Sequence, residues 1–380
     1  MRRAPAVIAS LNALVLLVAV VWLGLPTDNR EKNSKALQAV IPTLEAFVAK
    51  DRHLPFKRHV TIKVVGRDEV DKRFGASPRT ELLSLMLYVT GRTRSPKHFA
   101  NLTTSGNSDI VGFYDNAGHL YVVGEGQDNP YTRSVLVHEL THALDDQYFD
   151  LTKLQERKSA EFDRHDAELA LIEGDAERVR IDYVAQLTGA DRTAYAAARK
   201  KVVAGIDRHD PDDELLLTEE SGYPYLTGTT FAQALAKAGK VDQAFRSKAF
   251  TTHDVDVRRT ALPTSYPAVV LPNDPGATDE VSGTLGAHQL AVIVGDRAPR
   301  DDVHTLAVAW RSDGYWLSEP DANTDCLDVR LVLDPAAVAS VRATMTKVGM
   351  SVVVDNHDTK DQGTALRLHE CKTTDSLLSG

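Results

Sequence analysis

The stretch "VLVHELTHALDDQYFDL", Val135–Leu151, places two histidines four residues apart, with a glutamate directly after the first. Four residues turn an α-helix by about 400°, so the imidazoles of His138 and His142 should lie one turn apart on the same face. Two imidazoles arranged in this way can bind one cation at about 2.0–2.1 Å per nitrogen. Glu139 is rotated by about 100° from His138, which lets it take a proton from water at the metal's open position. The pattern therefore predicts a zinc site on a helix.

The residues around the motif indicate whether it arose by chance. The chain has 13 histidines, and a chance match in a chain of this length has odds of roughly a few per cent. The apolar neighbours of the motif are Val135, Leu136, Val137, Leu140, Ala143 and Leu144. A helix that is apolar nearly all round is buried, and buried imidazoles and carboxylates are costly without partners. The alternative is that the histidines bind nearby carboxylates or backbone groups and hold no metal.

A catalytic zinc usually has three protein ligands and a water molecule. The metzincin pattern fails, because Asp145 and Tyr148 stand where it requires glycine and histidine. Asp146 lies one turn beyond His142, and we expect it to bind an imidazole or to cap the end of the helix. The third ligand is therefore sought in another segment.

Glu173, in "AELALIEGDAERV", is the best candidate for the third ligand. It lies within an apolar stripe formed by Leu169, Ile172, Ala176 and Val179. A carboxylate that points into a core needs a cation, which is either a metal ion or a buried arginine or lysine. Gly174 favours a close approach of the two helices at this point. Asp175, about 200° round the helix from Glu173, is expected on the helix surface.

Together these segments resemble the gluzincin class of zinc metallopeptidases. Three segments are similar to segments of the bacterial "neutral zinc metallopeptidase-like" proteins, which are exported or membrane-tethered. These segments are "GFYD…LYVVG", "VHELTHALDDQYFDL" and "ALIEGDA". The resemblance covers about residues 111–185, and "YLTGTTFAQAL" extends it more weakly.

The resemblance implies a mainly helical, zincin-like peptidase domain with a small β-sheet. His138, His142 and Glu173 would hold Zn²⁺, and Glu139 would be the general base that activates water for hydrolysis of a peptide or protein substrate. The arm Leu120–Val123 would be an edge strand that pairs with an extended substrate. The oxyanion donor is left open among His165, Tyr148, Tyr223 and Tyr225.

The first residues form a separate segment. Residues 4–26 carry no charge and follow two arginines, which favours a transmembrane helix with the rest of the chain outside the cytoplasm. The alternative is a cleaved signal peptide, in which case the protein is secreted. Export allows Cys326 and Cys371 to form a disulfide, and the alternative is two buried thiols.

The remaining sequence predicts an α+β protein of 380 residues in three parts. These are an anchor over 1–27, a peptidase domain over 31–255 and a small α+β module over 279–380. A helix interrupted by Pro42 is expected over 31–50, a hairpin over 110–124, and a second hairpin around Ser312-Asp313-Gly314. The net charge of −9 argues against a nucleic-acid partner. The competing function is a catalytically silent exported protein that keeps this scaffold as a binding module.

Overall fold

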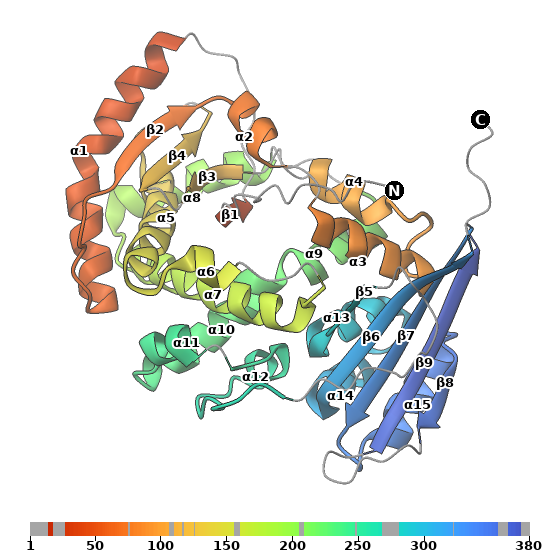
Figure 1. Cartoon of the computed structure of the whole chain (residues 1–380). Coiled ribbons are helices and arrows are strands. Elements are labelled where there is room, and N and C mark those ends of the chain that lie inside the picture. Colours follow the sequence, from red (N-terminus) through yellow and green to blue (C-terminus); the bar gives the residue numbers. More distant parts are fainter. Residues whose placement is uncertain are drawn as a thin grey trace, which may run out of the picture. The chain divides into compact units, whose positions relative to one another are not determined.

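The architecture of the computed structural model is α+β and mainly helical, as the sequence predicts (Figure 1). The chain divides into two compact units. The first comprises Met1–Ser77, Thr104–Gln155 and Val179–Asp207, and the second comprises Pro78–Thr103, Glu156–Arg178 and Arg208–Gly380. Segments of the predicted peptidase domain over 31–255 thus contribute to both units. The structure describes residues 14–17, 27–74, 77–105, 110–115, 118–124, 126–155, 160–204, 209–247, 249–267, 281–321, 323–355 and 364–373.

The first unit is built on a four-stranded sheet in the order β1-β3-β4-β2. Only the pair β2 and β4 is parallel, and the other neighbours are antiparallel. The strands are β1 (Leu14–Leu17), β2 (Thr61–Val65), β3 (Ile110–Tyr114) and β4 (His119–Val123). The helices are α1 (Thr27–Arg52), α2 (Arg67–Arg73), α5 (Pro130–Phe149), α6 (Leu151–Gln155) and α8 (Gly189–Ala204), together with the last turns of α7 (Phe162–Ala185).

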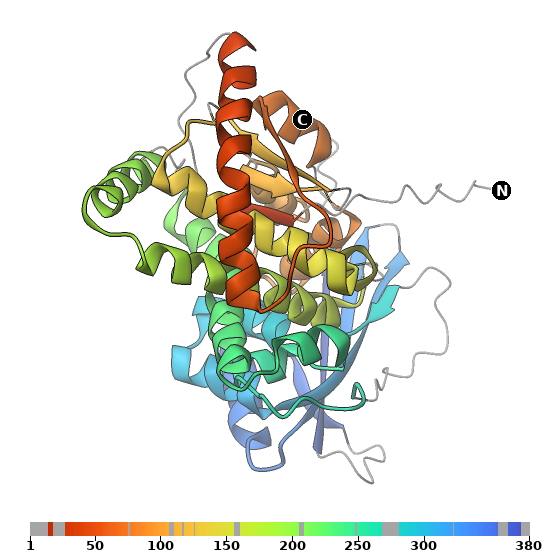
Figure 2. The same ribbon diagram turned by 90° about the vertical axis from the view of Figure 1, so that its left-hand side faces the viewer.

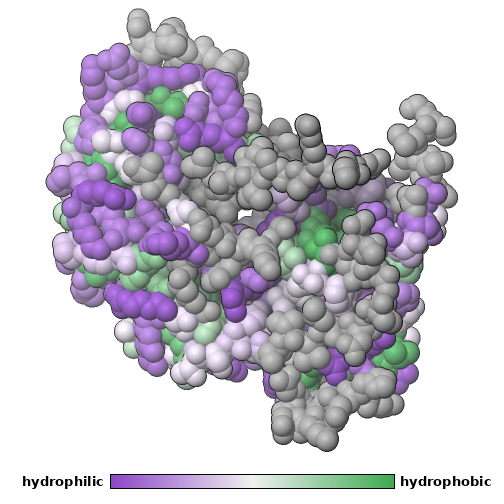
Figure 3. All heavy atoms as spheres, viewed as in Figure 1, coloured by the Kyte–Doolittle hydropathy of each residue, from purple (hydrophilic) through white to green (hydrophobic). Residues whose placement is uncertain are grey.

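Helix α1 runs without a break through Pro42, so the predicted interruption is wrong. It lies alongside β2 (Figure 2). Its inner face buries Leu37, Ile41, Leu44 and Val48 in a core shared with the sheet and α5. Pro42 lies on the exposed side of the helix. Proline has no N–H to donate within the helix, and burial of the apolar residues on the opposite face offsets this lost hydrogen bond. The outer side of α1 is mainly hydrophilic (Figure 3).

The hairpin of β3 and β4 forms where the sequence predicts it. However, β4 is not an edge strand, because β2 pairs with its other side from Thr61 to Val65. Its backbone groups are therefore already used on both sides, and the expected strand addition of a substrate to Leu120–Val123 is wrong. The sequence gives no sign of this parallel partner, which precedes β4 by more than fifty residues.

The predicted membrane segment over 4–26 lies outside the described residues, apart from Leu14–Leu17, which form β1. Among the helices that the structure describes, none has the length and apolar character needed to cross a bilayer.

The second unit contains a five-stranded antiparallel sheet in the order β5-β6-β7-β9-β8. Its strands are β5 (Val281–Gly283), β6 (Trp310–Asp321), β7 (Thr324–Leu333), β8 (Val352–Asp355) and β9 (Thr364–Thr373). The helices wholly or mainly in this unit are α3 (Pro78–Val89), α4 (His98–Ser105), α7, α9 (Pro211–Glu220), α10 (Tyr223–Lys237), α11 (Val241–Ser247), α12 (Thr252–Asp256), α13 (Gly286–Val294), α14 (Arg300–Ala309) and α15 (Val338–Lys347). A short 3₁₀ helix spans Gly295–Arg297.

One face of this sheet carries the core of the unit. Leu327, Val329, Leu331 and Leu333 alternate along β7 and pack in one apolar cluster with residues of α3, α13 and α15. The intervening side chains of β7 therefore point to the opposite face, as the two-residue period of a strand requires.

The predicted hairpin around Ser312-Asp313-Gly314 is wrong, because β6 continues as one strand from Trp310 to Asp321. Asp313 is buried rather than placed in a turn. Its carboxylate accepts hydrogen bonds from the backbone N–H groups of Leu285 and Gly286 and from the Trp310 indole N–H. A residue type typical of turns here anchors the start of α13 to the sheet.

Asp163, at the start of α7, is also buried. It accepts hydrogen bonds from the backbone N–H and hydroxyl of Thr252 and from the hydroxyl of Tyr266. Burial raises the pKa of Asp163 to about 7, because desolvation outweighs these hydrogen bonds. The folded protein therefore binds this proton more tightly than the unfolded chain does, whose aspartates titrate near about 3.9.

This difference makes the folded state more stable when Asp163 is protonated. The stabilisation is complete below the unfolded pKa and is lost as the pH rises through about 7. We expect the free energy of unfolding to fall by about 2 kcal/mol between pH 5.5 and 8 from this group. Urea unfolding across this range should show a weaker pH dependence in Asp163→Asn. The exposed Asp301→Asn on α14 is the matched control and should behave like wild type. Equal pH dependence in all three proteins would contradict the assignment.

Candidate metal centre

Helix α5 forms where the sequence predicts it, and its ends are well defined. The side chain of Asn129 caps its start by accepting hydrogen bonds from the backbone N–H groups of Tyr131 and Thr132, and Pro130 occupies the first turn. Asp150 ends it in the left-handed conformation, at φ 56°. Every residue from Ser134 to Asp145 is buried, as expected for a helix that is apolar nearly all round.

His138 and His142 lie next to each other on this helix, one turn apart. Both side chains are fully buried, and their ring centroids are 4.6 Å apart with the ring planes at 86°. Glu139 is also fully buried. The pair therefore has the spacing that the sequence predicts for two imidazoles that bind one cation.

Strand β3 packs against α5 next to Glu139, and a glycine makes this contact possible. A Cβ atom at Gly112 would lie 3.2 Å from Val135 Cγ1, 3.1 Å from the Tyr121 carbonyl oxygen and 3.6 Å from Glu139 Cγ. A larger residue would therefore press on Val135 and on the Tyr121 carbonyl, one turn of α5 before Glu139. This glycine is the first residue of the "GFYD" segment, but the sequence alone does not show what it contacts.

The two aspartates that follow the motif have separate structural roles. Asp145 forms a buried ion pair with Arg52 of α1, at 2.8 Å from Nη2. Asp146 accepts hydrogen bonds from the Leu151 backbone N–H and the Tyr114 hydroxyl, both at 3.0 Å. Burial raises the pKa of Asp146 although these hydrogen bonds act in the opposite direction. Asp146 thus satisfies a backbone group just after α5, in line with the expected role at the helix end.

Glu173 lies on α7 and is 2% exposed. The helix packs closely against a neighbour at Gly174. The sequence suggested that this neighbour is the histidine helix, but in the structure it is α10. A Cβ atom at Gly174 would lie 2.3 Å from the carbonyl of Gly228, and one at Gly228 would lie 2.2 Å from the carbonyl oxygen of Ala170. Gly228 belongs to "YLTGTTFAQAL", so the two segments meet through a pair of glycines.

This glycine contact predicts a large cost for the smallest possible substitution. Gly228→Ala places a methyl group against the backbone of α7, so the helices must separate, and we expect a loss of about 1–3 kcal/mol in the free energy of unfolding. Urea unfolding measures this loss. Leu226→Ala on the exposed side of the same helix is the control. A Gly228→Ala protein as stable as wild type would show that the helices do not pack this closely.

Asp175 is not on the surface, contrary to expectation. It is fully buried and accepts a hydrogen bond from Nε of Arg178 at 2.9 Å. Helix α7 is thus buried at Asp175 as well as at Glu173. The sequence could not show this, because the residues that cover α7 come from distant segments.

Two of the proposed oxyanion donors are engaged elsewhere. The Tyr148 hydroxyl donates to the Pro55 carbonyl at 2.7 Å. The Tyr223 hydroxyl donates to Asp256 at 3.1 Å, and burial raises the Tyr223 pKa well above its usual value. Neither tyrosine is therefore a ready donor for a substrate oxygen.

Three groups of side chains among the described residues bring possible ligand atoms within 4.8 Å of one another. These groups are His138, His142 and Glu173; Cys326, His369 and Cys371; and Asp166, Glu220 and His288. In the second group the two sulfur atoms are bonded to each other. That group holds a disulfide, so its sulfurs are not available as thiolate ligands.

The third group is a hydrogen-bonded network with its own cations. Arg79 pairs with Asp166 at 2.5 Å, and His288 pairs with Glu220 at 3.1 Å. The Gln289 amide donates to both carboxylates. Burial opposes a charged His288, but the hydrogen bond and charge of Glu220 prevail and raise the pKa of His288. Two acids are thus matched by two bases, which is a structural network rather than a metal site.

Two imidazoles and one carboxylate, all buried, match the ligand types that zinc prefers in catalytic sites. The first group is therefore the candidate metal centre. In searches with the whole chain, no family model, no curated protein and no solved structure matches it.

Proposed function

We propose that the protein is a zinc metallopeptidase in which His138, His142 and Glu173 hold the ion. The observation that carries the proposal is the buried set of these three side chains, whose ligand atoms lie within 4.8 Å of one another. A zinc ion at this place would neutralise negative charge on the buried carboxylates. When bound, it provides a Lewis acid that polarises a carbonyl and lowers the pKa of a water molecule to about 7.

Glu139 is the residue to which we assign proton transfer. It follows His138 directly on α5 and is fully buried. It takes a proton from the attacking water and later delivers it to the leaving amine. Strand β3 packs against α5 at this point, where Gly112 leaves room for Val135 and Glu139. The proposed substrates are peptides or exposed segments of proteins.

Metal analysis tests this proposal independently of turnover. We expect about one zinc per chain in wild type and a loss of zinc in His142→Ala, because two ligands hold the ion weakly. Zinc should also raise the melting temperature of the metal-free wild type, since a ligand that binds only the folded state stabilises it. His304→Ala, a histidine of α14, is the control and should keep its zinc. A wild-type protein that binds no zinc would reject the metal centre.

Peptide hydrolysis separates the enzyme from its silent alternative. A chelator should abolish hydrolysis of a peptide library by wild type, and added zinc should restore it. A chain that holds zinc but cleaves no peptide would instead be the catalytically silent binding module.

We also propose that residues 4–26 anchor the protein in the cell membrane with the rest of the chain outside the cytoplasm, in a form in which Leu14–Leu17 are released from β1. Their length without charge and the two preceding arginines support this. Protease added to intact cells should degrade the chain beyond the anchor. Full protection of the chain would contradict this orientation.

A further inference from the structure

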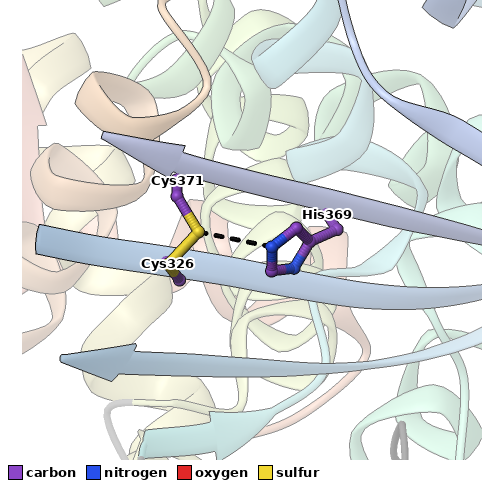
Figure 4. A group of neighbouring side chains, drawn as sticks. All are labelled: Cys326, His369 and Cys371. Atoms are coloured by element: carbon purple, nitrogen blue, oxygen red, sulfur yellow. Dashed lines mark hydrogen bonds between the residues drawn. A yellow bond between two sulfur atoms is a disulfide. The ribbon is translucent and has the colours of Figure 1, made fainter. Parts of the chain in front are cut away.

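Four polar side chains form a compact square on the outer face of the second unit's sheet, opposite its apolar core. Strands β7 and β9 pair in antiparallel register, with Cys326 opposite Cys371 and Asp328 opposite His369. The two cysteines form a disulfide, and the His369 ring lies beside it (Figure 4). Since residues two apart share a face of a strand, all four side chains point the same way.

A continuous relay connects a carboxylate to one sulfur of this disulfide. Nδ1 of His369 lies 2.9 Å from Oδ2 of Asp328, and Nε2 lies 3.3 Å from Sγ of Cys371. The carboxylate favours a proton on Nδ1, which leaves Nε2 directed at the sulfur. Asp328 is itself held by Arg367 at 3.1 Å. An imidazole beside a cysteine sulfur stabilises the thiolate, which is the reactive form.

Among the described residues of β7, β8 and β9, the other charged groups on this face are paired. Arg330 of β7 binds Asp355 of β8 at 2.7 Å, and Arg367 binds Asp328. The neighbouring positions of β6, Trp316 and Ser318, are uncharged. Asp321 lies further along β6, opposite Thr324, and accepts a hydrogen bond from the backbone N–H of Asn323. His369 is therefore the group on this face that can exchange a proton with the sulfur.

The two sulfurs differ in their access to solvent. Cys326 is only 6% exposed, whereas Cys371 is exposed and the His369 side chain is 58% exposed. A reagent from solution therefore reaches Cys371 first. Such a pair, with one accessible sulfur and one buried sulfur, has the arrangement needed for attack and resolution.

The strands hold the cysteines in place whether or not the sulfurs are bonded. The register of β7 and β9 continues without interruption from Thr324 opposite Thr373 to Leu333 opposite Thr364. Opening the disulfide therefore leaves the two sulfurs opposite each other, so the bond can form again without a large rearrangement.

We propose that Cys326, Cys371 and His369 form a thiol–disulfide exchange site whose substrates are low-molecular-weight thiols and disulfides. In the reduced form, the Cys371 thiol passes its proton to Nε2 of His369, and the thiolate attacks a disulfide R–S–S–R. One sulfur–sulfur bond forms between Cys371 and the substrate, and R–S⁻ leaves. The Cys326 thiol then gives its proton to the R–S⁻ that has left, its thiolate attacks Sγ of Cys371, and the second R–S⁻ leaves. Two cysteines are oxidised and one substrate disulfide is reduced, and an excess of small thiol drives the reverse reaction.

The reaction of the reduced full-length chain with an aromatic disulfide, 5,5′-dithiobis(2-nitrobenzoate), tests the proposal. Wild type should release two equivalents of thiolate and return to the disulfide without an adduct. Cys326→Ser should release one and keep a stable adduct on Cys371. Cys371→Ser should react at least about tenfold more slowly, because Cys326 is buried.

The role of His369 is tested by the pH dependence of the same reaction. At pH 6, His369→Ala should react about tenfold more slowly than wild type, and the difference should vanish near pH 9, where the thiol ionises unaided. His304→Ala is the matched control and should react as wild type does. Asp328→Asn should fall between the two, and circular dichroism verifies the fold of each variant.

Two results would overturn the proposal. One is an equal rate for His369→Ala and wild type at pH 6, and the other is Cys326 reacting as fast as Cys371. Neither result depends on zinc or on peptide hydrolysis, so this site and the proposed peptidase stand or fall separately.

Discussion

Glu139→Gln should lower the turnover number for peptide hydrolysis by about 10²–10⁴-fold while the zinc content stays the same. Glutamine has nearly the same shape as glutamate and cannot accept the proton of the attacking water. It is neutral, so it is also easier to bury at a fully buried position of α5. We therefore expect the melting temperature to be unchanged or slightly higher, and a fall in turnover cannot be attributed to unfolding.

The measurement is steady-state hydrolysis of a cleaved peptide, together with the zinc content of the same sample. Glu214→Gln on the exposed side of α9 is the matched control and should retain full turnover. If Glu139→Gln binds zinc and hydrolyses the peptide at the wild-type rate, Glu139 is not the base. If it loses zinc as well as activity, Glu139 acts on the metal site and its catalytic role must be assigned again.

The local features of the candidate site could be predicted from the sequence because they depend on helix geometry. The spacing of His138 and His142 fixes their separation on any helix, and the apolar residues between them fix their burial. The hairpin of β3 and β4 was predictable for a similar reason, since its turn residues and both strands lie within one short segment.

The wrong predictions concern contacts between residues that are far apart in the sequence. The arm Leu120–Val123 looked like an edge because its second partner, β2, comes from a distant segment. Gly174 indicated a close helix contact, but only the structure identifies Gly228 as the other side. Asp313 looked like a turn residue because nothing nearby in the sequence shows the backbone groups of Leu285 and Gly286 that it binds. In each case the deciding contact comes from a distant segment that the local pattern does not show.

The ion pair of Arg52 and Asp145 is a further contact of this kind, and it anchors α5 just after the histidine motif. Both side chains are buried, with exposures of 4% and 0%, and Asp145 Oδ1 lies within 3.2 Å of Arg52 Nε and 2.8 Å of Nη2. Two N–H groups of the guanidinium thus converge on one carboxylate oxygen, and both hydrogen bonds are charge-assisted. Removing one partner leaves a buried charge without its main counter-ion, which typically costs about 3–5 kcal/mol.

Arg52→Met and Asp145→Leu should therefore each lower the free energy of unfolding by about 3–5 kcal/mol, measured by urea denaturation. The double variant should be more stable than either single variant, because it removes both charges of this pair and buries two apolar side chains instead. Lys35→Met, which removes one partner of the exposed pair with Glu31, is the control and should cost little. If the two single losses simply add in the double variant, the residues are not coupled, and α5 is held against α1 by apolar packing alone.

If coupling is found, the double variant also tests whether the position of the histidines depends on this charge pair. Retention of zinc by a stable double variant would show that packing suffices, and loss of zinc would show that the ion pair sets the register of α5.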